Sequence, residues 1–186
     1  MVGLIGASGS GKSTLMRLIA GFETIDNGNG SIKLFGSLCQ ANGQKTSAVK
    51  TLRSDIGIIF QQFNLVGRLT LLMNVLVGRL GRVGRLQGTF GVFPKNDRIK
   101  ALQALERVGI VDKAYQRAST LSGGQQQRAA IARTLTQEAK LILADEPIAS
   151  LDPGSADKVM KSLRKINEQD KVTVIVSLHQ IEHAFK

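Results

Sequence analysis

Short apolar runs alternate along the chain with longer segments in which apolar residues recur every three or four positions. The short runs predict strands, and they lie at residues 1–5, 56–60, 141–144 and 172–177. The longer spacing predicts helices at residues 13–20, 69–77, 98–108 and 126–136. Strands that alternate with helices in this way are typical of an α/β fold built around a parallel sheet.

The same pattern predicts two lobes, the first of which is discontinuous in sequence. Residues 1–60 and 125–186 carry the strand–helix alternation and are expected to form the α/β core. Residues 61–124 have weaker strand signals and are expected to form an inserted helical subdomain, in which Gly109 stops a helix. Within the core, the polar residues 40–54 are expected to form a surface loop and a short helix.

A phosphate-binding loop follows the first predicted strand. Residues 6–13 read GASGSGKS, which fits the pattern G-x-x-x-x-G-K-[ST]. Its glycines let backbone N–H groups point inward as an anion-binding nest, and the next helix directs its positive end at the phosphates. Lys12 is expected to reach the β- and γ-phosphates, and the Ser13 hydroxyl to bind Mg²⁺. The predicted nucleotide-binding residues are Gly6, Ala7, Ser8, Gly9, Ser10, Gly11, Lys12, Ser13 and Thr14.

The apolar run at 141–144 ends in two acids, Asp145 and Glu146. Such a continuous run is typical of a central strand covered on both faces, and ligands of open α/β sheets bind at the carboxyl ends of the strands. Asp145 is therefore expected to be the Mg²⁺ partner, and Glu146 to polarise the attacking water as a general base.

The run Leu121-Ser122-Gly123-Gly124-Gln125 lies between these two sites and begins a predicted helix. Read alone, Ser-Gly-Gly-Gln is equally a helix cap. In the order phosphate loop, Ser-Gly-Gly-Gln run and acid pair, however, the chain resembles the nucleotide-binding subunit of ABC transporters. The resemblance implies a P-loop NTPase core with a parallel sheet plus an inserted helical subdomain.

The resemblance also implies that two identical subunits stack head to tail around ATP. Ser122, Gly123, Gly124 and Gln125 would then close over ATP held by the opposite subunit, because the two glycines expose backbone donors to phosphate. Asp152 lies in a loop that crosses the dimer interface in this family. The expected cofactors are ATP and Mg²⁺.

Two further residues match functional positions of the family. Gln61 matches the glutamine that contacts Mg²⁺ and the attacking water and senses the membrane partner, and Gln62 is its only rival. His179 matches the histidine that holds the γ-phosphate. The resemblance therefore predicts that Glu146, His179 and Gln61 are catalytic, and that Ser13, Gln61 and Asp145 lie around the metal.

Four segments are similar to phosphonate-importer ATPases in particular; they are residues 60–66, 74–78, 144–153 and 177–180. This similarity implies an ATPase that powers phosphonate import as a peripheral subunit at the cytoplasmic face of the inner membrane. Its partners would be a transmembrane permease and, indirectly, a periplasmic solute-binding protein. The same motifs would serve an ABC importer of another solute, such as polar amino acids.

An ABC ATPase of DNA repair or translation is the alternative from a different class. Such proteins usually carry a coiled-coil insertion or a second ATPase domain, and neither pattern is present, so no nucleic-acid partner is expected. Family members also have a β-subdomain with an adenine-stacking aromatic residue before the phosphate loop, and further strands after the histidine. We therefore expect this N-terminal β-subdomain and the C-terminal end to be missing here.

Composition agrees with a cytoplasmic domain. No run approaches the ~20 apolar residues of a membrane span, no signal-peptide pattern begins the chain, and the single Cys39 excludes an internal disulfide. The net charge is +11, and with no Trp and one Tyr the stacking residues of a nucleic-acid site are sparse. We interpret the basic stretch as a solvated loop near a membrane surface. Its cations are Arg68, Arg79, Arg82, Arg85, Lys95, Arg98 and Lys100.

The last motif is a zinc-protease pattern, H-x-x-E-H, at residues 179–183. A catalytic zinc normally needs a third protein ligand, and only three residues follow the pattern. His179 already has the γ-phosphate role that the family resemblance implies, so we do not assign a zinc site to this pattern.

Overall fold

A computed structural model describes residues 1–28 and 30–178 of the chain. Its centre is a four-stranded sheet in the order β1-β7-β6-β5, in which each neighbouring pair is parallel. The strands are β1 (Val2–Ile5), β5 (Ile56–Ile59), β6 (Leu141–Asp145) and β7 (Thr173–Leu178). The predicted parallel α/β fold is confirmed, and β6, with four consecutive buried apolar residues, lies inside the sheet.

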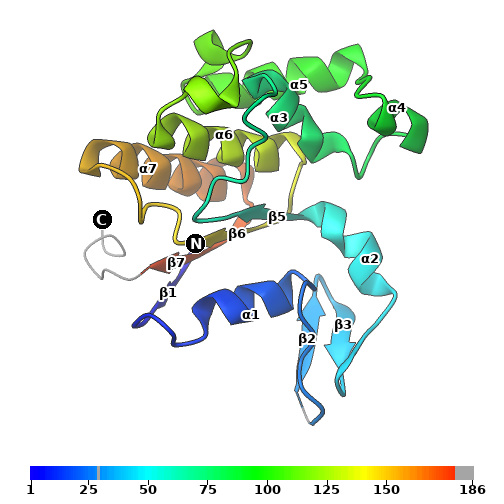
Figure 1. The fold of residues 1–186 in the computed structure, drawn as a ribbon. Helices are drawn as coiled ribbons and strands as arrows, with labels where there is room; N and C mark the ends of the chain where they lie inside the picture. The colour runs from blue at the N-terminus through cyan, green and yellow to red at the C-terminus, as the bar shows by residue number, and fades with distance from the viewer. Residues whose placement is uncertain (29, 179–186) are drawn as a thin grey trace.

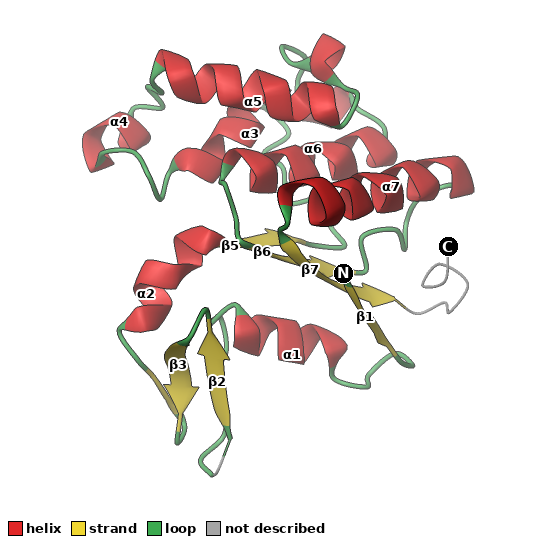
Figure 2. Cartoon of the chain, turned by 180° about the vertical axis from the view of Figure 1, so that it is seen from behind, coloured by secondary structure: helices red, strands yellow, loops and turns green. Residues whose placement is uncertain are grey.

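Helices cover both faces of this sheet, as Figures 1 and 2 show from opposite sides. Helix α1 (Lys12–Ile19) covers one face, where Met16 and Ala20 pack with Ile56, Leu141 and Leu143. Helices α6 (Gly123–Thr136) and α7 (Pro153–Asp170) cover the other face and enclose the larger hydrophobic core. Because both faces are buried, the strands show continuous apolar runs rather than alternation.

A helical layer lies on the outer side of α6. Its main members, α3 (Leu71–Leu76) and α5 (Lys95–Arg107), pack against α6 through a shared core that includes Leu76, Leu105 and Ile131. Thr70 caps α3 by accepting a hydrogen bond from Met73 N. The short helices of the described chain are α2 (Ala48–Leu52), α4 (Arg85–Thr89), η1 (Arg53–Asp55), η2 (Val77–Arg79), η3 (Val111–Lys113) and η4 (Ala118–Thr120).

An antiparallel sheet of three strands follows α1, and the sequence analysis did not predict it. It consists of β2 (Ser31–Leu34), β3 (Ser37–Ala41) and β4 (Gln44–Lys45) in sequence order. The turn between β3 and β4 is Asn42-Gly43, and both residues have positive φ, as a tight hairpin turn requires. The segment 40–54, expected to be a loop and a short helix, therefore begins with strand residues, and its helix is α2.

The buried Gln40 fixes this small sheet to α1. Its side-chain amide donates to Leu18 O at 2.6 Å and to Glu23 O at 3.1 Å, and its carbonyl oxygen accepts from Ile25 N at 3.0 Å. All of its polar atoms are thus satisfied inside the protein, as burial of an amide demands.

The interpretation of the basic stretch as a solvated loop is wrong for Arg79, which is buried, whereas Arg82 is exposed but held by an ion pair. Arg79 is 9% exposed, and its guanidinium lies 2.9 Å from Asp97 and 2.8 Å from Glu138. Arg82 pairs with Asp55 at 2.9 Å and donates to Gln137 O at 2.9 Å. These arginines join the helical layer to the chain that follows α6. The bonds from Lys100 and Arg79 lower the pKa of Glu138 to about 2.

Candidate functional site

The phosphate loop connects β1 to α1. Gly9 and Gly11 have φ of 79° and 88°, a left-handed conformation in which a side chain would be strained. Gly11 is the N-cap of α1 and provides no side-chain cap, so the first N–H groups of this helix are available to an anion. A cavity of about 180 Å³ lies here, and its lining residues are Ser8, Gly9, Ser10, Gly11, Lys12, Ser13, Thr14 and Glu146.

Lys12 folds over the loop. Its Nζ donates to Gly6 O at 2.8 Å, to Ala7 O at 2.9 Å and to Ser10 Oγ at 3.4 Å. A lysine ammonium held by carbonyl oxygens at the edge of an anion-binding nest can exchange those acceptors for phosphate oxygens. The loop thus fits the phosphates of a nucleotide.

The acid pair lies at the carboxyl end of β6, beside the start of α1. Ser13 Oγ donates to Asp145 Oδ1 at 2.9 Å, although the two residues are 132 positions apart. A serine hydroxyl and a carboxylate are hard oxygen donors of the kind that Mg²⁺ binds, so this pair fits the ion. Glu146 lines the phosphate-loop cavity, and its φ of 47° is uncommon for a residue with a side chain.

Ser177 is a site residue that the sequence analysis missed. Its Oγ donates to Asp145 Oδ1 at 2.8 Å and accepts from Glu146 N at 2.9 Å. The available signal was a serine that directly follows the apolar residues 174–176 near the carboxyl end of the strand.

Gln61 follows Phe60 just after β5, the strand next to β6. Gln61 and Gln62 are both exposed. Phe60 lines a small hollow together with Ser13 and Asp145, which places the Gln61 loop at the same edge of the sheet as the acid pair.

Residues 122–125 form the first turn of α6 with a complete capping box. Ser122 Oγ accepts from Gln125 N at 3.3 Å, and Gln125 Oε1 accepts from Ser122 N at 2.9 Å. A Cβ on Gly124 would lie 2.5 Å from Ser155 Oγ, so this glycine allows α6 to approach α7 closely. These residues are not among those that line the phosphate-loop cavity, so one chain does not bring the two predicted halves of the nucleotide site together.

Asp152 is the N-cap of α7 and accepts from Ser155 N at 2.9 Å. Hydrogen bonds from Ser155 lower the pKa of the Asp152 carboxyl, so this exposed side chain is ionised at neutral pH. His179 and the H-x-x-E-H pattern lie outside the described residues. Within residues 1–28 and 30–178, no cluster of three or more His, Cys, Asp or Glu could hold a metal ion.

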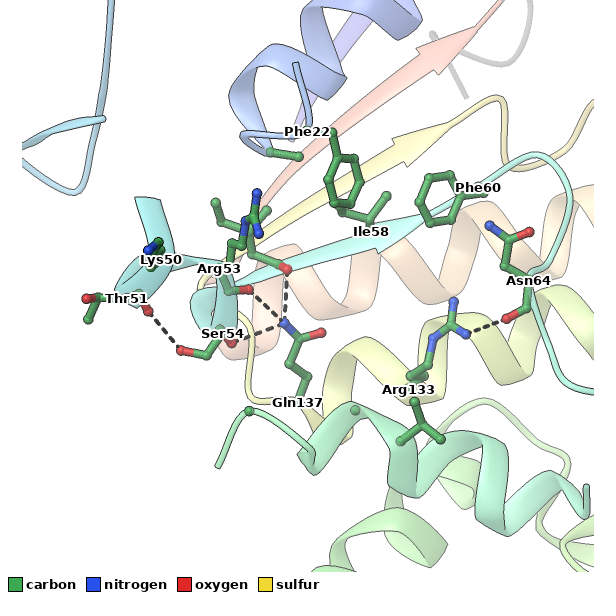
Figure 3. A pocket seen from close by; sticks show the side chains of 15 residues that line it. Phe22, Lys50, Thr51, Arg53, Ser54, Ile58, Phe60, Asn64, Arg133 and Gln137 are labelled. Carbon is green, nitrogen blue, oxygen red and sulfur yellow. Dashed lines mark hydrogen bonds between the residues drawn. The ribbon is translucent and has the colours of Figure 1, made fainter. Parts of the chain in front are cut away.

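A second hollow is a groove of about 680 Å³ at the junction of the sheet and the helical layer (Figure 3). Phe22 and Phe60 stack at one side, with ring centroids 6.4 Å apart. On the other side, Gln137 donates to Ser54 O at 3.1 Å and to Ile56 O at 2.9 Å. Val77, Gly78 and Gly81 line the groove from the helical layer.

Comparison with known proteins gives a family for this chain. The family model of the ABC transporter matches residues 1–149. Phosphonates import ATP-binding protein PhnC 1 of Pseudomonas aeruginosa is 60% identical over 100% of this chain and 67% of its own length. PhnC of Caulobacter vibrioides is 57% identical over 100% of this chain and 70% of its own length. The chain thus spans about two thirds of the length of these relatives.

Solved structures agree with this match. The chain is similar to the dimeric structure of MJ0796, a bacterial ABC transporter cassette, with a TM-score of 0.81 and 35% identity over 100% of this chain and 77% of that one. It is also similar to a post-hydrolysis dimer of the same cassette bound to ADP and Pi, with a TM-score of 0.75 and 35% identity over 99% and 76%. None of the helices in the described part of the chain could span a bilayer. The chain therefore belongs to the ATP-binding subunits of ABC transporters, in the family of the phosphonates import ATP-binding proteins.

Proposed function

We propose that this chain binds and hydrolyses ATP and thereby powers an ABC importer of phosphonates. The observation that carries the proposal is the hydrogen bond from Ser13 to Asp145, which joins the phosphate loop to the acid pair at one cavity. We infer that phosphonates are the solute because the chain's relatives are named phosphonates import proteins and match it over its full length. The solute itself is handled by other subunits.

We assign the nucleotide's phosphates to residues 6–14 and Mg²⁺ to Ser13, Asp145 and Gln61. When bound, the ion neutralises charge on the phosphate oxygens. Lys12 Nζ donates to the β- and γ-phosphates in place of the Gly6 and Ala7 carbonyls. The backbone N–H groups at the start of α1 also bind the phosphates.

Glu146 accepts the proton of the attacking water as the general base, because it is a carboxylate that lines the cavity of the phosphate loop. Gln61 orients the same water, and His179 holds the γ-phosphate. Catalysis then rests mainly on positioning and charge stabilisation, as is general for phosphoryl transfer.

A second copy of the chain completes the site. Residues 122–125 lie outside the cavity of their own chain, so the head-to-tail homodimer places Ser122, Gly123, Gly124 and Gln125 over ATP of the partner. Asp152 brings an ionised carboxylate to the same interface. A dimer is also the state of the similar cassette described above.

The groove of Figure 3 is the surface that we assign to the permease. Its lining combines apolar side chains (Phe22, Phe60 and Val77) with the cations Lys50, Arg53 and Arg133. Phe60 lies in its wall immediately before Gln61, so a permease segment in the groove would act on the loop that carries Gln61. In this proposal the chain is a peripheral subunit at the cytoplasmic face of the inner membrane. The periplasmic solute-binding protein acts indirectly, through the permease, and no nucleic acid takes part. Residues 61–124 then form the helical subdomain that the permease moves against the core.

Replacement of Lys12 tests the assignment of the phosphate loop. Lys12→Ala is expected to weaken MgATP binding by about 10- to 100-fold, because it removes a charged hydrogen-bond donor to phosphate. Titration calorimetry of the wild type and the variant measures the difference. Lys158→Ala, at an exposed position on α7, is the control and should bind as the wild type does. Equal affinity of all three proteins would contradict the assignment.

A charge placed in the groove tests the permease surface. Val77→Glu is expected to leave ATP hydrolysis by the isolated subunit unchanged and to weaken assembly with the permease by about tenfold or more, as the loss of an apolar anchor does. Val111→Glu is the control, because Val111 is a similarly exposed valine of the helical layer (41%, against 36% for Val77) that does not line the groove. Co-purification of each variant with the permease gives the readout. If both variants assemble equally well, the groove is not the contact surface.

A further inference from the structure

Ser177 is a polar residue among the buried residues of β7. Its neighbours Val174, Val176 and Leu178 are apolar and buried, and Ser177 itself is 0% exposed. A buried hydroxyl costs free energy unless its hydrogen bonds are made, so packing alone would favour an apolar residue at this position. The strand register places Ser177 directly beside Asp145 of β6.

Both hydrogen-bonding capacities of this hydroxyl are directed at the acid pair. The Ser177 hydroxyl donates its single proton to Asp145 Oδ1 at 2.8 Å. The same oxygen accepts a hydrogen bond from the backbone N–H of Glu146 at 2.9 Å. One side chain therefore fixes the carboxylate of the first acid and the backbone of the second. The second bond holds Glu146 where its φ is 47°, a conformation that surrounding contacts must stabilise.

Asp145 Oδ1 receives two hydroxyl donors, Ser13 at 2.9 Å and Ser177 at 2.8 Å. Ser13 is exposed enough to turn toward a ligand in the cavity, which it lines. Ser177 has no such freedom, because it lies in a buried strand and does not line that cavity. It is the donor that stays with Asp145 when Ser13 changes its partner.

We propose that Ser177 is a positioning residue of the hydrolytic site, which orients the Asp145 carboxylate for Mg²⁺ and the Glu146 backbone for base catalysis. This inference rests on the proposed ATPase function. It predicts that the hydroxyl, rather than the volume of the side chain, is what this position contributes.

The pair Ser177→Thr and Ser177→Val separates these two contributions, because threonine and valine have the same shape and only threonine keeps the hydroxyl. We expect Ser177→Val to lower kcat by about 10- to 100-fold, because it removes the two hydrogen bonds that the hydroxyl makes to the acid pair. We also expect its half-saturating Mg²⁺ concentration for binding a non-hydrolysable ATP analogue to rise by about tenfold, with Mg²⁺-free affinity unchanged. Ser177→Thr should stay within about threefold of the wild type in both measurements.

Val174→Ala is the control for damage to β7, since Val174 pairs with Ile142 away from the site. It should lower the melting temperature and leave the Mg²⁺ dependence of analogue binding unchanged. Ser177→Ala is a second variant that adds no bulk, and it should behave as Ser177→Val does if the latter folds poorly.

Wild-type kcat and Mg²⁺ dependence in both Ser177→Val and Ser177→Ala would overturn the role of Ser177 while leaving the ATPase function intact. Equal impairment of the threonine and valine variants would also overturn it, because shape would then be the cause. A wild-type protein that hydrolyses no ATP alone or with its permease would overturn the proposed function and this inference together.

Discussion

Glu146→Gln is expected to hydrolyse ATP about 10² to 10⁴ times more slowly than the wild type, the usual worth of a general base. The amide has the same shape as the carboxylate but does not accept a proton from water. The bond from Glu146 N to Ser177 Oγ involves the backbone, so the substitution keeps the local conformation. MgATP binding should therefore stay within about threefold of the wild-type affinity. Phosphate release under saturating MgATP gives the rate.

Glu106→Gln is the matched control, because it changes an exposed carboxylate of α5 outside the site. It should turn over as the wild type does. A Glu146→Gln protein with wild-type turnover would remove Glu146 from the mechanism.

Arg79→Met is expected to lower the free energy of unfolding by about 3–5 kcal/mol, the cost of breaking a buried ion pair from one side. The side chains of Arg79 and Asp97 are 11% and 7% exposed, so the substitution leaves the Asp97 carboxylate buried without its cation. It also removes a bond to Thr136 O and one partner of Glu138. Urea denaturation followed by circular dichroism measures the change.

The exposed pair Arg107–Asp170 provides the comparison. Its side chains are 41% and 31% exposed, so Arg107→Met should lower the free energy of unfolding by about 1 kcal/mol or less. Adding Asp97→Leu to Arg79→Met should recover part of the loss, because it removes the buried charge. Similar small effects of Arg79→Met and Arg107→Met would show that the buried pair does not stabilise the helical layer.

The parts of the structure that the sequence predicted are those in which a local pattern has one physical meaning. The apolar run of β6 is too short for a typical helix and is therefore typical of a buried strand, and GASGSGKS between a strand and a helix leaves few alternatives to a phosphate loop. The antiparallel sheet was missed although Asn42-Gly43 is a hairpin signal. Its strands are only four, five and two residues long, so an alternation such as that of Ser31–Leu34 is too short to predict a strand by itself.

Other features depend on contacts between distant segments, which a sequence does not show. Arg79 and Arg82 resemble a solvated basic loop until the fold brings Asp55 and Glu138 to them. Ser177 can bond to Asp145 only because the strand register places the two residues side by side.

In the proposed mechanism, ATP is held between two copies of this chain. Light scattering on a size-exclusion column, with the slowly hydrolysing Glu146→Gln variant, tests it most directly. The variant should have the monomer's mass without nucleotide and twice that mass in MgATP. Adding Ser122→Asp should abolish the dimer, because aspartate keeps the helix cap but places a negative charge against the partner's phosphates. A Glu146→Gln protein that binds MgATP stoichiometrically and remains a monomer would contradict the claim.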